Sequence, residues 1–261
     1  MTTRKATPPA LAAVVLGTTL VLGACGSSGS SQSSSTTLPS ATSPASPTTP
    51  ADPAYHPTIV PSAFTSHVTN PYFPLRPNTT DVYQGTRDGQ PQRDEVVISS
   101  EIRTIMGVRC QVVRDTVTSN GALVEKTTDW YAQSSTGDVW YFGEATAEYV
   151  NGQISSTHGT WEAGVDSAQP GIIMKAHPKP GDSYRQEYRP GQAEDTAKVL
   201  QTTATVKVPV GTFHNVVVTN DTDPLNPDKS DHKSYASGVG MIHSERVRSG
   251  HHEVIDLVRY G

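Results

Sequence analysis

Apolar and polar residues alternate along most of the chain from residue 80 onward, with the two-residue period of β-strands. The predicted strands cover residues 80–84, 95–106, 108–118, 122–133, 139–150, 153–161, 196–208, 212–219, 232–236, 241–247 and 252–258. Asn120-Gly121 and Asn151-Gly152 are strong hairpin signals between them. No segment has the i, i+3, i+4, i+7 apolar spacing of an amphipathic helix. The pattern predicts an all-β single domain of about nine to eleven strands, arranged as an antiparallel meander in a strongly curved sheet or open barrel.

Two of the three tryptophans lie in one predicted hairpin, residues 129–144, which we expect to organise the core. If residues 134–138 form its loop, Ala132 lies opposite Trp140 and Trp130 lies opposite Phe142. These four residues then share one face of the sheet. Tyr131 and Tyr141 occupy the other face, where we expect their hydroxyl groups to reach water.

Three proline-containing segments interrupt the alternation. Residues 70–75 are predicted to lie against an edge or end of the sheet as a plug, with recognition of another protein as the alternative. Residues 164–191 are predicted to be an irregular cover over one face of the sheet, and such a cover can also gate a ligand. Residues 221–231 are predicted to be a solvated acidic loop.

The N-terminus has the order of a secretory signal. Basic Arg4 and Lys5 precede the apolar run 10–22, which is too short to span a bilayer and ends at Leu22-Gly23-Ala24-Cys25. This tetrapeptide resembles the bacterial lipobox, in which the cysteine carries a diacylglyceryl thioether and becomes the first mature residue. The sequence thus predicts a lipoprotein signal peptide at 1–24 and a lipid anchor at Cys25, and an ordinary secretory signal is the alternative. The anchor predicts a location on the extracytoplasmic face of the cell membrane.

A tract rich in Ser, Thr and Pro follows the predicted anchor. It has no periodic apolar face, so residues 25–53 are predicted to be a disordered linker. The folded extracytoplasmic domain is then residues 54–261.

The composition excludes some classes of partner and chemistry. The net charge is −5 with no basic stripe, which argues against nucleic acid as a partner. With Cys25 assigned to the anchor, Cys110 has no disulfide partner. It alternates with Val108 and Val112, so we interpret it as a small buried hydrophobic residue.

Several phrases resemble a family of uncharacterised secreted proteins and lipoprotein precursors common in actinobacteria. They are Phe73-Pro74-Leu75, Asp129-Trp130-Tyr131-Ala132-Gln133, Asp138-Val139-Trp140-Tyr141-Phe142-Gly143-Glu144 and Gly171-Ile172-Ile173-Met174. This resemblance implies location and shape but no reaction. More loosely, residues 208–213 and 235–240 are similar to strand-turn phrases of curved-sheet envelope proteins, including lipoprotein carriers whose concave face holds acyl chains.

The chain has none of the common catalytic or cofactor motifs. It contains no Gly-x-Ser-x-Gly elbow, no His-Glu-x-x-His and no paired Cys-x-x-Cys, and Gly238-Val239-Gly240 lacks a third glycine. We therefore predict no cofactor and no metal. Asp221, Asp223, Asn226 and Asp228 could offer oxygen ligands to calcium, but their spacing departs from an EF-hand loop.

The favoured function is a binding or structural module of the cell envelope, with an apolar or glycan ligand as partner. The candidate ligand-binding residues are Trp130, Trp140, Phe142, Trp161, Ile173 and Tyr184. The alternative is a carboxylate-dependent hydrolase of cell-wall or glycan material, because carboxylates near tryptophans can act as general acids. Its candidate acidic site is Glu144, Glu162, Asp166, His177 and Glu187, with Glu148 and His158 as further members of the constellation.

Overall fold

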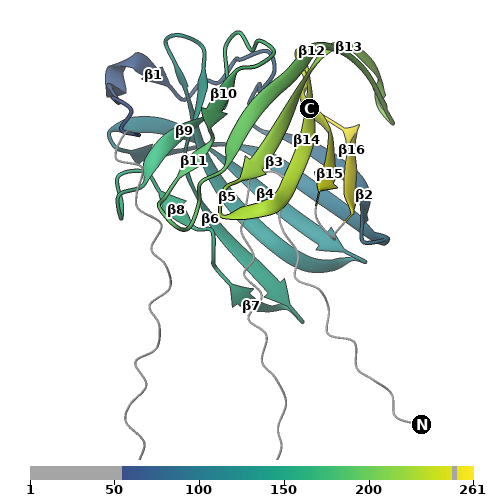
Figure 1. Ribbon diagram of the computed structural model, residues 1–261. Helices are drawn as coiled ribbons and strands as arrows, with labels where there is room; N and C mark the ends of the chain where they lie inside the picture. Colours follow the sequence, from purple (N-terminus) through teal and green to yellow (C-terminus); the bar gives the residue numbers. More distant parts are fainter. Residues whose placement is uncertain (1–54, 249–251) are drawn as a thin grey trace, which may run out of the picture.

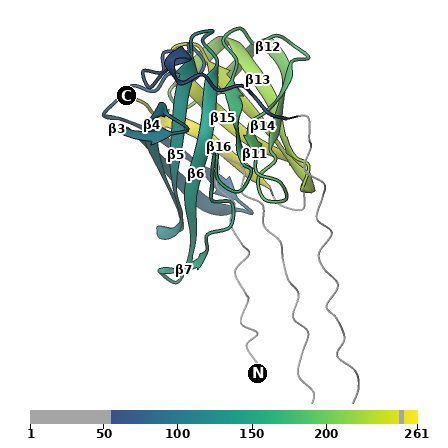
Figure 2. The ribbon, with the colours of Figure 1, turned by 90° about the vertical axis from the view of Figure 1, so that its left-hand side faces the viewer.

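In the computed structural model, residues 55–248 and 252–261 are described, and they form one antiparallel sheet that curls into a nearly closed barrel (Figures 1 and 2). The predicted signal peptide, the predicted anchor at Cys25 and the predicted linker lie outside these residues. Within the described chain the sheet has sixteen strands, more than the sequence pattern predicted, and helical structure is limited to the short 3-10 turn η1 (Pro61–Ala63). The all-β prediction is confirmed.

The long strands form two meanders, one in each half of the domain, and within each meander every strand pairs with the next. They are β2 (Thr79–Arg87), β3 (Gln90–Ile105), β4 (Val108–Ser119), β5 (Ala122–Ser134), β6 (Val139–Val150), β12 (Thr196–Val208), β13 (Gly211–Asp223), β14 (Asn226–Ala236), β15 (Gly240–Arg248) and β16 (Glu253–Arg259). Strand β16 pairs with β2, which joins the C-terminal half of the sheet to the N-terminal half. Asn120-Gly121 and Asn151-Gly152 adopt positive φ at hairpin turns, as their sequence predicts.

Short strands complete the barrel. They are β1 (Phe64–Thr65), β7 (Gln153–Ser156), β8 (Trp161–Glu162), β9 (Gln169–Met174), β10 (Ser183–Arg185) and β11 (Glu187–Tyr188). The predicted cover at 164–191 contains three of them, because β9 extends the sheet from β6, and β11 and β10 bring it next to β12. This segment is therefore part of the wall of the barrel as well as a connection.

The predicted loop at 221–231 is wrong. Strands β13 and β14 run through it, with Asp221 paired to Asp231 and Thr222 to Ser230 across the two strands. Asp221, Asp223 and Asp231 are buried, and Lys233 and Arg246 from the same wall balance the charges of Asp221 and Asp231.

The aromatic hairpin forms with the predicted register at Ala132 and Trp140. Trp130, Trp140 and Phe142 lie on the outer face, where the ring centroid of Phe64 is 6.0 Å from that of Trp140 and 5.6 Å from that of Phe142. Arg103 lies 4.2 Å above the Trp130 ring. This cover explains why aromatic residues on the outer face are shielded from water.

The expected exposure of Tyr131 and Tyr141 is wrong. Their rings stack at 4.9 Å on the inner face, and they are 1% and 0% exposed. The inner face is buried because the sheet closes on itself. Cys110 is fully buried and unpaired, and burial raises the pKa of its thiol to about 12, which confirms its interpretation as a buried hydrophobic residue.

Candidate functional site

One end of the barrel is closed by Asn70–Leu75, which we call the plug, at the opposite end from the β6–β7 hairpin (Figure 2). Asn70 is the point of attachment on one side. Its Nδ2 donates to the carbonyl oxygens of Gly137 (3.0 Å) and Lys175 (3.1 Å), and its Oδ1 accepts from the backbone N–H of Tyr72 (2.9 Å). One buried amide therefore holds the plug to the β5–β6 turn and to the segment after β9.

The other side of the plug is attached to the β14–β15 turn. The N–H of Gly238 donates to the carbonyl oxygen of Pro71 (2.7 Å), and Arg76 Nη2 donates to the carbonyl oxygen of Gly238 (2.6 Å). The plug thus spans the barrel mouth from one wall to the other, which confirms the prediction that residues 70–75 lie against an end of the sheet.

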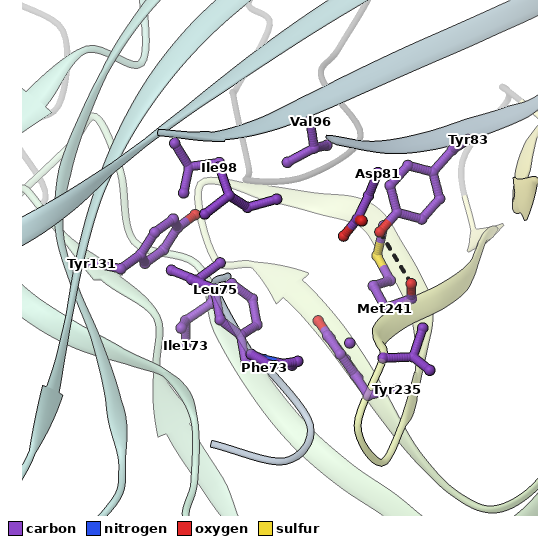
Figure 3. A pocket seen from close by; sticks show the side chains of 14 residues that line it. Phe73, Leu75, Asp81, Tyr83, Val96, Ile98, Tyr131, Ile173, Tyr235 and Met241 are labelled. Atoms are coloured by element: carbon purple, nitrogen blue, oxygen red, sulfur yellow. Dashed lines mark hydrogen bonds between the residues drawn. The ribbon is translucent and has the colours of Figure 1, made fainter. Parts of the chain in front are cut away.

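Phe73 and Leu75 point into the barrel, where they line an apolar cavity of about 50 Å³ (Figure 3). The other lining residues are Pro74, Asp81, Tyr83, Val96, Ile98, Val113, Tyr131, Ile173, Tyr235, Val239, Gly240 and Met241. The ring of Phe73 lies 5.2 Å from that of Tyr131. A cavity of this size holds one or a few waters and is much smaller than the ~300 Å³ that a lipid or drug-sized ligand requires.

A larger and more polar hollow, which we call the mouth groove, lies beside the plug and has a volume of about 750 Å³. It is lined by Thr69, Asn70, Pro71, Tyr72, Gln133, Ser135, Thr136, Gly137, Ala176, His177, Pro178, Lys179, Thr202 and Asn215. These residues come from the plug, the β5–β6 turn, the segment after β9 and the β12–β13 hairpin. The volume falls in the range of small-ligand sites, and the lining offers hydroxyl and amide groups but no carboxylate.

Farther from the plug, the interior of the barrel changes from apolar to acidic. Asp94 follows the parity of Val96 and Ile98 on β3, and Asp129 follows that of Tyr131 on β5, so these carboxyl groups face inward. Six buried carboxyl groups, which we call the acidic wall, belong to Asp94, Asp115, Glu125, Asp129, Glu144 and Glu187.

Tyr141 links two members of the acidic wall. Its hydroxyl oxygen lies 2.7 Å from Asp129 Oδ1 and 3.1 Å from Glu144 Oε2. A tyrosine has one proton to donate, so the second short contact requires a protonated carboxyl that donates to the tyrosine oxygen. Burial and the charges of Glu187 and Asp129 raise the pKa of Glu144 well above its ordinary value.

The opposite wall carries the balancing cations. Lys229 Nζ lies 3.2 Å from Asp195 Oδ2, Lys233 Nζ lies 3.0 Å from Asp221 Oδ2, and Arg246 Nε lies 2.8 Å from Asp231 Oδ1. Each of these cations is thus already paired with a carboxylate of its own wall.

The structure separates the aromatic residues predicted to bind a ligand. Trp130, Trp140 and Phe142 lie under Phe64 on the outer face, whereas Trp161 packs against Tyr141 at 5.2 Å on the inner face. Ile173 lines the small cavity, and Tyr184 is buried with Lys175 5.7 Å from its ring. The structure therefore does not bring the predicted aromatic platform together.

The predicted acidic site is also divided. Glu144 and Glu187 lie close enough for the charge of Glu187 to raise the pKa of Glu144, and Trp161 lies opposite Glu144 across β6 and β8. Glu162 instead pairs with Arg103, and Asp166 with Arg189. His177 lines the mouth groove. Glu144 and Glu187 are both 0% exposed, so this pair has no opening to a substrate.

Sequence reasoning missed four members of the acidic wall, Asp94, Asp115, Glu125 and Asp129. The signal for these residues was their position in the two-residue alternation of the strands. Asp115, for example, stands two residues from Val113 and from Val117, so it occupies an inward position of its strand. A charged residue at an apolar position of a strand indicates a polar interior when the sheet closes.

Fold and site together define an all-β barrel closed by a segment that precedes its first long strand. No protein-family model matches the chain, and no curated protein sequence matches it. A Bacteroides fragilis protein named as exported and as having a YmcC-like fold aligns at 15% identity over 73% of this chain and 98% of its own, with a TM-score of 0.43. A Parabacteroides distasonis protein named as a lipoprotein aligns at 12% identity over the same shares, with a TM-score of 0.40.

Among residues 55–248 and 252–261, no three His, Cys, Asp or Glu side chains are arranged to hold a metal ion. In the same part of the chain, no helix has the length and apolarity needed to cross a bilayer.

Proposed function

We propose that the protein is a lipid-anchored binding module of the cell envelope that holds a hydroxyl-rich ligand, such as a glycan, in the mouth groove. The observation that carries this proposal is the contrast between the two cavities. The groove has about 750 Å³ with a mixed polar lining, whereas the apolar cavity has about 50 Å³ and is closed by the plug. A ligand of small-molecule size is accommodated only by the first of these two.

The chemistry of the groove favours a saccharide. The hydroxyl groups of Thr69, Ser135 and Thr136 and the amide of Asn215 can donate to and accept from sugar hydroxyls. The ring of Tyr72 supplies an aromatic face with a polar end, which suits a sugar ring.

The hydrolase alternative has less support. The groove lining contains no Asp or Glu, and the Glu144 and Glu187 carboxyl groups are enclosed in the barrel. General acid–base catalysis requires a carboxyl within hydrogen-bonding reach of the substrate. The proposal is therefore binding without hydrolysis.

Binding can be tested by calorimetric titration of the full chain with neutral oligosaccharides of hexoses and pentoses. Tyr72→Ala should weaken binding about tenfold or more, because it removes the stacking face, which corresponds to ~1.4 kcal/mol. Tyr260→Ala is the matched control, since Tyr260 is 43% exposed and does not line the groove. Absence of saccharide binding, or equal binding by wild type and Tyr72→Ala, would contradict the proposal.

The anchor is tested separately from the ligand. In a bacterial host that processes lipoproteins, the wild type should partition into the detergent phase, and Cys25→Ala should move it to the aqueous phase, because two acyl chains are lost. A Cys25→Ala protein that stays in the detergent phase would show that the anchor assignment is wrong, and it would leave the groove proposal intact.

A further inference from the structure

Fewer cations face the acidic wall than the wall has carboxyl groups. Its six carboxyl groups come from β3, β4, β5, β6 and β11, and each is no more than 3% exposed. Arg87 on β2 is near Glu125 but is also near Glu253 and Asp88. Lys229 and Lys233 face Glu187 but already pair with Asp195 and Asp221.

Several carboxyl oxygens of the wall have no donor. As carboxylates, Asp94 and Glu187 would leave both oxygens without a hydrogen bond from any described N–H or hydroxyl group, and among the described residues Asp115 would have only the backbone N–H of Thr116. An ionised carboxylate that is buried without donors is costly, whereas a neutral carboxylic acid is much less so. A proton on Asp115 lets it donate to Asp94, and the contact becomes a hydrogen bond.

Other titratable groups packed against the wall add negative charge or stay neutral. They are Tyr83 on β2, Tyr131 on β5, Tyr141 and Glu148 on β6, Asp195 before β12, Asp223 on β13 and Glu253 on β16. Glu125 accepts hydrogen bonds from the hydroxyls of Thr127 and Thr146, and these favour its ionised form. Burial nevertheless outweighs them.

We propose that the acidic wall makes the folded barrel a proton-binding structure, stable when its carboxyl groups are protonated and weakened as the pH rises through neutrality. The geometry carries the proposal, since the carboxyl groups face one another across adjacent strands with the available cations already paired. It is independent of the mouth groove.

The direction of the effect follows from linkage. Burial raises the pKa of Asp94 from 3.8 to about 6, and burial with the charge of Asp195 raises that of Asp223 to about 6. Burial also raises the pKa values of Asp115, Glu125, Asp129, Glu144 and Glu187. The folded state then binds more protons than the unfolded state. The contribution of these groups to the free energy of unfolding is therefore fully present below about pH 4 and is lost as the pH rises through 6 and above. Asp231 acts in the opposite sense, because Arg246 lowers its pKa despite burial, but its contribution changes only below its ordinary value of 3.8.

Urea denaturation of the full chain, followed by tryptophan fluorescence, tests this at about pH 5 and about pH 8. The folding equilibrium constant of the wild type should be roughly a hundredfold or more smaller at the higher pH, because each group whose pKa rises from about 4 to about 6 contributes about tenfold over this interval and several groups are raised. Asp115→Asn and Glu144→Gln replace acids by neutral isosteres, and each should reduce this ratio about tenfold or more. Asp228→Asn is the matched control, because Asp228 is an exposed carboxylate and should leave the ratio unchanged.

A wild type that is equally stable or more stable at the higher pH would overturn the proposal, as would variants that keep the wild-type ratio. If the variants do not fold, ¹³C NMR of the wild-type carboxyl groups decides the matter. At least two Asp or Glu carboxyl resonances should titrate above pH 6, and titration of all of them below about pH 5 would refute the proposal.

Discussion

Gly143 on β6 stands where β6 and β8 approach each other closely, next to the acidic residue Glu144. Its φ is 134°, and a Cβ built there would lie 2.4 Å from the carbonyl oxygen of Trp161 and 2.9 Å from the Cα of Glu162. Both atoms belong to backbone and cannot move aside as a flexible side chain can. The position therefore requires glycine both for its conformation and for its space.

Gly143→Ala should lower the free energy of unfolding by about 2–4 kcal/mol, because it adds backbone strain and a clash with β8. Gly152→Ala is the matched control. Gly152 also has positive φ, 77°, but no atom lies within 4 Å of its added Cβ, so it should cost ~1 kcal/mol. Urea denaturation measures both, and equal losses would mean that strand proximity at Gly143 is unimportant.

Single residues also explain where sequence reasoning succeeded and failed. Cys110 was placed correctly because its alternation with Val108 and Val112 is a local signal. Asp221 was misplaced in a solvated loop, because its burial depends on Lys233, which lies on the neighbouring strand. The local alternation of apolar and polar residues does not show which side chains on neighbouring strands form ion pairs.

Among the elements, the plug has two faces with different roles. Tyr72 lines the mouth groove, while Phe73 and Leu75 line the apolar cavity (Figure 3). Residues 70–73 form a turn in which the N–H of Phe73 donates to the carbonyl oxygen of Asn70 (3.1 Å). Tyr72 and Phe73 therefore face different sides, and one segment serves the surface and the core at once.

Leu75→Ala should lower the free energy of unfolding by about 2–5 kcal/mol, because Leu75 is buried and its loss enlarges the cavity below the plug. Tyr72→Ala should cost less stability, since Tyr72 is half-buried, and should weaken saccharide binding more. Thermal unfolding and calorimetric binding measure the two effects. The reverse order, with Tyr72→Ala the more destabilising, would contradict this assignment of faces.

Strand boundaries were predictable where alternation was uninterrupted. The predicted 139–150 and 196–208 coincide with β6 and β12. The short strands β9, β10 and β11 were not predicted, because Pro170, Gly171 and Pro178 indicate irregular chain. Gly171 allows the backbone of Gln186 to approach so closely that its carbonyl oxygen would lie 2.3 Å from an added Cβ.

For the whole molecule, closure of the sheet decides which residues can serve a function. The sequence pattern predicted a curved all-β domain, but it could not show that the two ends of the sheet meet and enclose Glu144 and Glu187. In the closed sheet, Trp161 lies on a different face from Trp130 and Trp140, although the sequence predicted that they share one site. The mouth groove was not predicted, because four separate segments form it.

If the domain is lipid-anchored as proposed, the attachment of Tyr55 has a mechanical consequence. Tyr55 packs against Tyr188 with ring centroids 5.2 Å apart, and its hydroxyl donates to the carbonyl oxygen of Pro170 at 2.9 Å. Tension from a tethered N-terminus would reach β9 and β11 through this tyrosine before it could pull on Asn70. The plug would thus be protected from this tension, and the mouth groove would keep its shape while the tension acts on the domain.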